Sequence, residues 1–289
     1  MNIVYLVFGD KIDHYQQVYF SIYTAMARKS SDDRILVIAE NPELFNSIGE
    51  RIEIILIDRK KITEWEGEHK FFWRVKIKAL EHVAEKYPDE DLLYLDGDTF
   101  FYENADELRA KLESGQNFMH LEEGKLAKLK SKTERKMWQQ MQGKTYAGIK
   151  IDTNATMWNA GLIGISKNHF DCLQLTLAIN DAMCADGVTR RLIEQFAFSL
   201  GLDAYSKLKP ADHIVGHYWG NKNEWNSLIN GFLKESFMKN YSFEQIIGKV
   251  REMDLTKIPI RVRQSNTHKK LTKFISSFYK DLKPVYIRK

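Results

Sequence analysis

The chain has 289 residues, 44% hydrophobic and 28% charged, a composition typical of a folded globular protein and not of a disordered one. Its formal net charge of +4 conceals a basic tail, because residues 261 to 289 hold nine Lys and Arg against one Asp. The remaining body is mildly acidic, which argues against nucleic acid as a partner.

Cysteine content and hydropathy further restrict the class of protein and its cellular compartment. Two cysteines are too few for a disulfide framework or a zinc site, so we expect a protein of a reducing, cytoplasmic compartment. No apolar run reaches the roughly 18 residues that a membrane-spanning helix needs. The first ten residues have an apolar run too short for a signal peptide, and we expect them to form a strand.

Strands and helices alternate over the first hundred residues. Apolar runs predict strands at 3–8, 34–39, 52–57 and 92–95, and helical patterns lie at 15–29 and 72–86. Regular alternation predicts a mostly parallel central sheet with helices on both faces, an α/β fold. No Gly-x-Gly-x-x-Gly fingerprint follows the first strand, which disfavours a dinucleotide-binding domain.

The pattern changes after residue 104. We expect strands at 118–121 and 162–165, and helices at 108–112, 126–142, 170–183, 189–200 and 232–250. These elements suggest a main domain at 1–225, made of one half at 1–104 and a second half at 105–225. A helical, basic extension follows at 226–289.

Two carboxylates stand where the buried strand at 92–95 ends. Asp96 and Asp98 flank Gly97, and residues two apart in an extended chain point to the same side. The glycine lets the backbone turn tightly, so both carboxylates can approach one cation. Carboxylate oxygens suit Mg²⁺ or Mn²⁺, which in turn hold phosphate oxygens. The alternative is an Asp-Gly-Asp turn that only ends a strand.

Three later stretches carry further candidates. Asn159-Ala160-Gly161 would let the backbone pass close to a ligand, with an amide able to donate to a hydroxyl. Glu194-Gln195 lies in an otherwise apolar helix. His213 and His217 are four residues apart, but the neighbouring glycines and Pro210 favour a strand and a loop, so we expect only one of them to be a ligand.

Taken together, these motifs resemble glycosyltransferases of the GT-A fold, most closely family 8, which includes glycogenin and bacterial lipopolysaccharide galactosyltransferases. The matching stretches, in order, are Phe8-Gly9-Asp10 with Tyr15, Arg74 in FFWRVKIKAL, YLDGD at 94–98, WNAGLIGI at 158–165, Glu194-Gln195 and HYWGNKNEW at 217–225. The chain departs from the family where Glu194 replaces an Asp, and where the last loop reads Gly-x-Lys-x-x-Trp.

The resemblance implies that 1–225 is a catalytic domain, with a nucleotide-binding half at 1–104 and a donor-sugar and acceptor half at 105–225. It also implies a role for each matching residue. Asp96, Asp98 and His217 would hold the metal, Mn²⁺ in preference to Mg²⁺ because an imidazole joins two carboxylates. The other implied roles are Lys222 on the diphosphate, Arg74 near the phosphate or sugar, Gly97 in the donor-binding turn, Phe8, Asp10 and Tyr15 at the base, and Asn159, Glu194 and Gln195 around the donor sugar.

The implied activity is metal-dependent transfer of a hexose from a nucleotide-sugar, a UDP-sugar first, to a glycan or a lipid-linked saccharide. Family 8 retains the anomeric configuration, and we expect retention. Three alternatives stay open: a nucleotidyltransferase, a catalytically silent sugar-nucleotide-binding module of the same fold, and a phosphohydrolase of the haloacid dehalogenase type. The last requires its Thr one position later than Thr99.

The basic tail gives a separate prediction. Apolar residues spaced as on one helical face lie between lysines in residues 265 to 289: Leu271, Phe274, Ile275, Phe278 and Leu282. Such a helix would dock on the anionic inner face of a membrane, where surface polysaccharide or lipopolysaccharide is made. The alternative is a helix that packs on the catalytic domain with its lysines in water.

Overall fold

The computed structural model describes residues 1–261, and its strands and helices follow the expected alternation. The first half contains β1 (Asn2–Val7), α1 (Ile12–Arg28), β2 (Arg34–Ala39), β3 (Glu53–Leu56), α2 (Arg59–Glu66), α3 (Arg74–Lys86), β4 (Leu92–Leu95), β5 (Thr99–Phe101) and α4 (Asp106–Glu113). The second contains β6 (Phe118–Lys125), α5 (Lys132–Met141), β7 (Thr145–Tyr146), β8 (Ile149–Lys150), β9 (Thr156–Ile165), α6 (Asp171–Ala185), α7 (Ile193–Asp203), β10 (Lys209–Pro210), β11 (Val215–His217), α8 (Lys222–Met238) and α9 (Phe243–Glu252).

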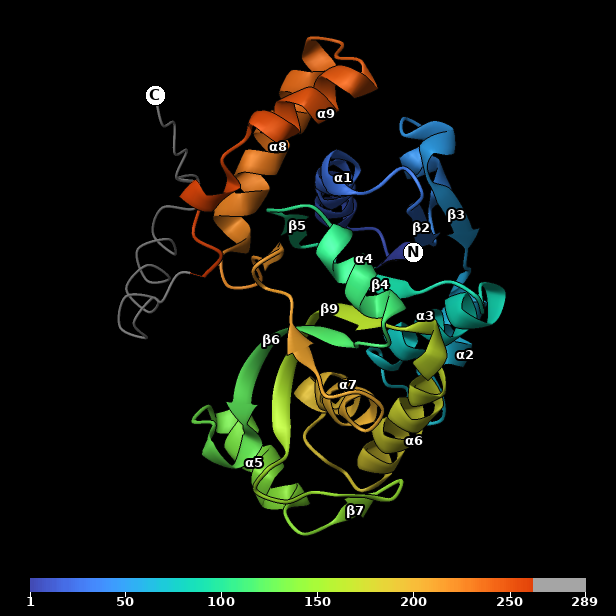
Figure 1. Ribbon diagram of the computed structural model, residues 1–289, viewed down its shortest axis with the longest axis vertical. Helices are drawn as coiled ribbons and strands as arrows, with labels where there is room; N and C mark the ends of the chain where they lie inside the picture. The colour runs from blue at the N-terminus through green and yellow to red at the C-terminus, as the bar shows by residue number, and fades with distance from the viewer. Residues whose placement is uncertain (262–289) are drawn as a thin grey trace.

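A seven-stranded sheet in the order β10-β6-β9-β4-β1-β2-β3 forms the centre of the molecule (Figure 1). β1 pairs in parallel with β2 and with β4, and β2 pairs in parallel with β3. β9 runs antiparallel between β4 and β6, and short β10 is parallel to β6. The prediction of a mostly parallel sheet is therefore confirmed.

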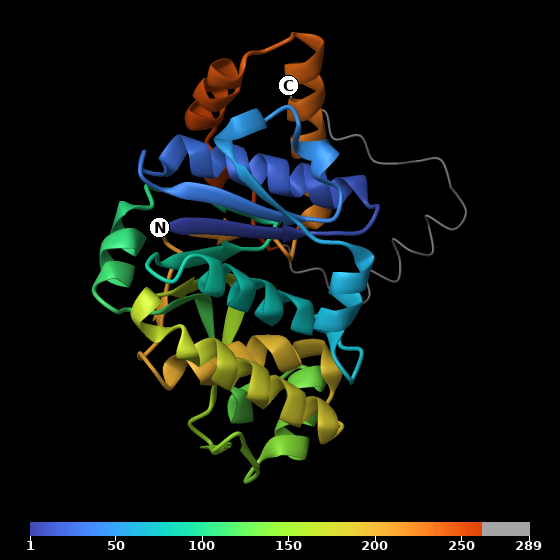
Figure 2. The ribbon, with the colours of Figure 1, turned by 90° about the vertical axis from the view of Figure 1, so that its right-hand side faces the viewer.

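Helices cover both faces of this sheet, as Figure 2 shows for α1 on one side of β1 and α3 on the other. Alternate residues of β1 point to opposite faces. Ile3 and Tyr5 pack in the core beneath α1, α8 and α9, whereas Val4 packs in the core beneath α3, α6 and α7. Both faces are buried, which explains why β1, β2 and β4 are continuous apolar runs.

Two predicted helices have different limits for local reasons. The helix expected at 232–250 is two helices, because Asn240 adopts a left-handed conformation (φ 50°) and Ser242 caps α9 in a capping box with Gln245. The helix expected at 126–142 is shorter, because β6 continues to Lys125 and a capping box at Ser131 begins α5. The linker after β3 contains α2, whose N-terminus is capped by Asp58.

The described part of the predicted C-terminal extension packs on the sheet domain. The boundary expected at residue 225 falls inside α8, and both α8 and α9 contact α1. Trp225 of α8 is buried against Phe100, with ring centroids 4.4 Å apart. The amphipathic helix predicted within 265–289 lies outside the described residues. Within residues 1–261, no helix combines the length and apolar character that crossing a membrane requires.

Candidate functional site

A cavity of about 540 Å³ opens at the edge of the sheet where β1 and β4 end. These two strands are parallel neighbours, so the segments that follow them emerge side by side, which is where open α/β sheets bind ligands. The lining includes Phe8, His14, Gln17, Phe72, Trp73, Lys76, Tyr94, Asp96, Gly97, Asp98, Gly161, Arg191, Glu194, Gln195, His217, Trp219 and Lys222.

The Asp-Gly-Asp turn is fixed by contacts of its own backbone. The Thr99 hydroxyl donates to the Asp96 carbonyl oxygen at 2.7 Å and closes the turn after β4. Gly97 packs so closely on α1 that a Cβ atom at this position would lie 2.9 Å from Cγ2 of Val18. A side chain here would have to displace Val18 or the turn, so glycine fits best between the two carboxylates.

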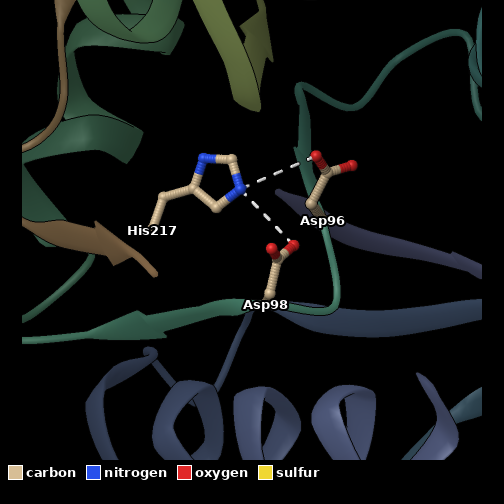
Figure 3. Close-up of side chains that lie close together, drawn as sticks. All are labelled: Asp96, Asp98 and His217. Atoms are coloured by element: carbon tan, nitrogen blue, oxygen red, sulfur yellow. Dashed lines mark ion pairs between the residues drawn. The ribbon is translucent and has the colours of Figure 1, made fainter. Parts of the chain in front are cut away.

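His217 joins this turn through a second, two-stranded sheet. β11 pairs antiparallel with β5 so that His217 lies opposite Thr99, next to the turn. Its Nε2 atom is 3.4 Å from Asp98 Oδ1 and 4.0 Å from Asp96 Oδ2, and Figure 3 shows the ring pointing between both carboxylates. The three potential ligand atoms lie within 4.8 Å of one another, a spacing that one metal ion can bridge.

Asn159 determines which nitrogen of a neutral His217 ring carries the proton. Its Oδ1 atom accepts from the backbone N–H of Gly161 at 3.0 Å, so this atom must be the amide oxygen and not the nitrogen. The same oxygen lies 2.8 Å from Nδ1 of His217. An oxygen can only accept there, so a neutral imidazole carries its proton on Nδ1 and directs the lone pair of Nε2 at the carboxylates.

Gly161 leaves the space that the His217 ring occupies. A Cβ atom at Gly161 would lie 2.0 Å from Nδ1 of His217, closer than non-bonded atoms can approach. Its carbonyl oxygen accepts from the Asp96 backbone N–H at 2.9 Å, so β9 and the Asp-Gly-Asp turn are held together here. The glycine in the Asn159-Ala160-Gly161 stretch is thus required by the imidazole.

The donor set fits a hard or borderline divalent cation. Two carboxylates and one imidazole on short, buried elements suit Mn²⁺ or Mg²⁺. Lys222, at the start of α8, places Nζ 2.8 Å from Asp98 Oδ2. Burial alone would raise the pKa of Asp98, but the positive charges of a protonated His217 and of Lys222 outweigh it and lower that pKa, so the carboxylate stays ionised at neutral pH.

A second charged group, which sequence reasoning missed, adjoins the first. Lys76 of α3 places Nζ 3.1 Å from Asp96 Oδ1 and 3.0 Å from Glu194 Oε1. Tyr94 donates its hydroxyl to Asp96 Oδ1 at 2.8 Å. Burial alone would lower the pKa of Lys76, but the two carboxylates outweigh it and raise that pKa. Lys76 therefore remains a cation inside the cavity.

Glu123 of β6 connects the two remaining predicted polar residues. It accepts from Gln195 Nε2 at 3.0 Å and from Asn159 Nδ2 at 3.3 Å. Burial raises its pKa, although these two amides act in the opposite direction. Because Asn159 uses both ends of its side chain in this way and does not line the cavity, it supports His217 from behind.

Four of the residues assigned to ligand binding from the sequence lie elsewhere. Arg74 is held by Asp181 of α6, with Nε to Oδ1 at 2.8 Å, and does not line the cavity. Tyr15 is buried, and its hydroxyl donates to the Gly9 carbonyl oxygen at 2.9 Å. Asp10 is exposed outside the cavity, and Asn159 lies behind it. Phe8, Gly97, Glu194, Gln195 and Lys222 do line it, as do the three metal-ligand candidates.

The fold is similar to that of solved glycosyltransferases. A galactosyltransferase, LgtC, in complex with donor and acceptor sugar analogues superposes with a TM-score of 0.51 at 12% identity, over 80% of this chain and 96% of that one. An active-site mutant of LgtC gives 0.48 at 14% identity, covering 73% and 72%. Mouse xyloside xylosyltransferase 1, in its apo form, gives 0.47 at 9% identity, covering 73% and 85%.

The match to LgtC at a TM-score of 0.51 defines the class of fold. The chain has the GT-A glycosyltransferase fold, an α/β fold with a mostly parallel sheet, and an Asp-x-Asp cluster at the edge where strands of that sheet end. The sequence itself matches no family model and no curated protein. At 12% identity the likeness to LgtC establishes the fold, and the activity must be argued from the site.

Proposed function

We propose that this protein is a metal-dependent glycosyltransferase, which moves a hexose from a nucleotide-sugar to a saccharide acceptor. The observation that carries the proposal is the cluster of Asp96, Asp98 and His217, with Lys222 beside it, in the lining of a 540 Å³ cavity. A cavity of this size suits a nucleotide-sugar, and the cluster offers both ligands for a metal and a fixed cation for a diphosphate.

The reaction breaks the bond between the anomeric carbon and the diphosphate oxygen, which leaves with the electron pair. The same carbon forms a bond to an acceptor hydroxyl oxygen, whose proton passes to the departing diphosphate. Bound between Asp96, Asp98 and His217, Mn²⁺ or Mg²⁺ would stabilise that charge as a Lewis acid. Lys222 has an exposed side chain on the first residue of α8 and can turn its ammonium from Asp98 to a phosphate oxygen. Asn159 holds the imidazole in the tautomer that the metal needs.

The donor sugar would lie between this cluster and α7. Glu194 is buried, and burial raises its pKa, while Lys76 acts in the opposite direction by pairing with it. Together they form a polar floor on which sugar hydroxyls can exchange hydrogen bonds, with Gln195 beside them. Phe8 and Phe72, whose ring centroids are 5.1 Å apart, offer an apolar surface for the base at the end of β1.

UDP-sugars are the first donors to test, and retention of the anomeric configuration is part of the proposal. A glycan or lipid-linked saccharide of a surface polysaccharide is the proposed acceptor. Contact with an anionic membrane through residues 265–289 belongs to the same proposal, since the sequence there combines lysines with an apolar helical face.

The experiment is a screen for nucleotide release from UDP-glucose, UDP-galactose, UDP-N-acetylglucosamine and GDP-mannose with Mn²⁺, Mg²⁺ or EDTA. One donor should turn over, even slowly to water, and EDTA should abolish the turnover. Nuclear magnetic resonance of the released or transferred sugar reads its anomeric configuration. Tight, metal-dependent nucleotide binding without turnover of any donor would instead identify a silent binding module.

A further inference from the structure

Three aromatic side chains at the cavity are unusually exposed. Phe72, Trp73 and Trp219 are 49%, 43% and 45% exposed, and all three line the cavity. Large apolar side chains in a cavity that also holds polar groups usually contact a ligand. They form two groups, because Phe72 lies against Phe8 and Trp73, whereas Trp219 belongs to the loop between β11 and α8.

A short segment after α9 holds Trp219 in place. Arg261 lies over the indole ring, with Cζ 4.9 Å from the ring centroid, and forms a bridge with Gly220. A Cβ atom at Gly220 would lie 2.7 Å from Cγ of Arg261, so only glycine permits this approach. The Pro259 carbonyl oxygen accepts from Asn221 Nδ2 at 2.8 Å and fixes the same segment. Trp219 is therefore an ordered surface and not a loose loop tip.

Trp219 follows His217 by two residues, and His217 contacts Asn159, which Glu123 joins to Gln195. Burial raises the pKa of Glu123, and the charge of Arg261 is near enough to act against that rise. Glu123 in turn holds Gln195, which lines the cavity. The group formed by Phe8, Phe72 and Trp73 lies instead where β1 ends and α3 begins. The cavity thus has two aromatic surfaces. Phe8, Phe72 and Trp73 lie where we expect the nucleotide base, and Trp219 lies on the side of Gln195.

We propose that the acceptor binds by stacking a pyranose ring on the indole of Trp219, an inference that rests on the proposed function. One face of such a ring carries C–H groups that stack on an indole, while its hydroxyl edge can reach Gln195. Arg261 is a positioning residue, because its guanidinium lies over part of the Trp219 indole and holds that ring in place. The acceptor class is a glycan recognised through its terminal ring, and Trp73 serves the nucleotide instead.

The test separates the two surfaces by binding alone. The full-length protein is saturated with UDP and Mn²⁺, and saturation-transfer nuclear magnetic resonance measures binding of methyl glycosides of glucose, galactose and N-acetylglucosamine, and of lactose and maltose. Trp219→Ala should raise the Kd of the best-bound saccharide at least ten-fold and change the Kd of UDP less than two-fold. Trp219→Phe should recover most of the affinity, and Trp73→Ala should show the reverse pattern. Phe237→Ala, at an exposed aromatic far from the cavity lining, is the matched control.

Two results overturn the inference. One is that none of these saccharides binds the UDP-loaded protein, and the other is that Trp219→Ala weakens UDP as much as it weakens the saccharide. Arg261→Ala should raise the saccharide Kd less than Trp219→Ala does, because it frees the indole without removing it. Failure of the wild-type protein to bind UDP with Mn²⁺ would count against the proposed function itself, which keeps the two failures distinct.

Discussion

Replacing Asn159 by leucine should weaken metal binding without touching a metal ligand. Leucine has nearly the same size, but it cannot accept from Nδ1 of His217 or from the Gly161 N–H, which Asn159 Oδ1 contacts at 2.8 and 3.0 Å. The imidazole then loses the partner that fixes its tautomer and ring orientation. Loss of such a supporting hydrogen bond typically lowers metal affinity by about 10–100-fold, or about 1.4–2.7 kcal/mol.

Two further variants identify the cause of that loss. Asn159→Asp keeps an oxygen for His217 and should retain more Mn²⁺ affinity than the leucine variant, although its second oxygen faces the Glu123 carboxylate. Glu123→Gln changes the group that accepts from Asn159 Nδ2 and leaves the contact between Asn159 Oδ1 and His217 intact. It should therefore bind Mn²⁺ within about two-fold of wild type, a change of about 0.4 kcal/mol.

The assay is a titration of Mn²⁺ followed by the electron paramagnetic resonance signal of the free ion, with circular dichroism to establish that each variant is folded. A folded Asn159→Leu protein that binds Mn²⁺ as tightly as wild type would refute the reasoning. So would equal losses in Asn159→Leu and Glu123→Gln, because the effect would then not act through the imidazole.

Three other predictions follow from the same geometry. Gly161→Ala should abolish Mn²⁺ binding, because its Cβ would lie 2.0 Å from Nδ1 of His217; retained affinity in the titration would contradict the packing. Lys76→Met removes the cation that pairs with buried Glu194 and with half-buried Asp96, and should lower the free energy of unfolding in urea by about 3–5 kcal/mol, against less than about 1 kcal/mol for Lys86→Met, which pairs with the partly exposed Glu53, on the same helix. Burial lowers the pKa of His120 from 6.5 to about 4, so the unfolded chain binds the proton first as pH falls. The contribution of neutral His120 to the free energy of unfolding should therefore be complete above pH 6.5 and fall by up to about 3 kcal/mol towards pH 4. The difference in unfolding free energy between wild type and His120→Gln, measured against pH, should show that decrease.

The sequence predicted the part of the site that depends on strand ends. An apolar run followed by Asp96-Gly97-Asp98 identifies both the end of a buried strand and the carboxylates after it, since each signal is local. His217 was also predicted, but its pairing partner was not. β5 has only three residues, Thr99–Phe101, directly after the turn, and so short a segment does not predict that β11 will pair with it.

Helix faces explain why Lys76 of α3, and not Arg74, lines the cavity. Arg74 and Lys76 are two positions apart, and a helix turns by about 200° over that distance, so they point in nearly opposite directions. Arg74 reaches Asp181 on α6, and Lys76 reaches Asp96 in the cavity. Which of two cations on an amphipathic helix faces a site depends on how the helix packs, and that cannot be predicted from their spacing.

Burial explains why Tyr15 and Asn159 do not line the cavity. Tyr15 packs on Phe45 with ring centroids 6.0 Å apart and donates to the backbone, so an aromatic residue near a strand end is here part of the core. The family resemblance placed Asn159 on the donor sugar, and its small neighbours predicted that the backbone passes close to a ligand. The small residues serve instead to admit the His217 ring, a long-range contact between residues 58 positions apart.

The central claim is that Asp96, Asp98 and His217 hold a metal that binds the diphosphate of a nucleotide-sugar. Isothermal titration calorimetry with UDP, GDP, CDP and ADP, each with and without Mn²⁺, tests it directly on wild type and on Asp98→Ala. The account predicts that one nucleotide, UDP first, binds only with Mn²⁺ and that Asp98→Ala loses this binding. Nucleotide binding that is indifferent to Mn²⁺ and to Asp98→Ala, or absent for all four nucleotides, would contradict it.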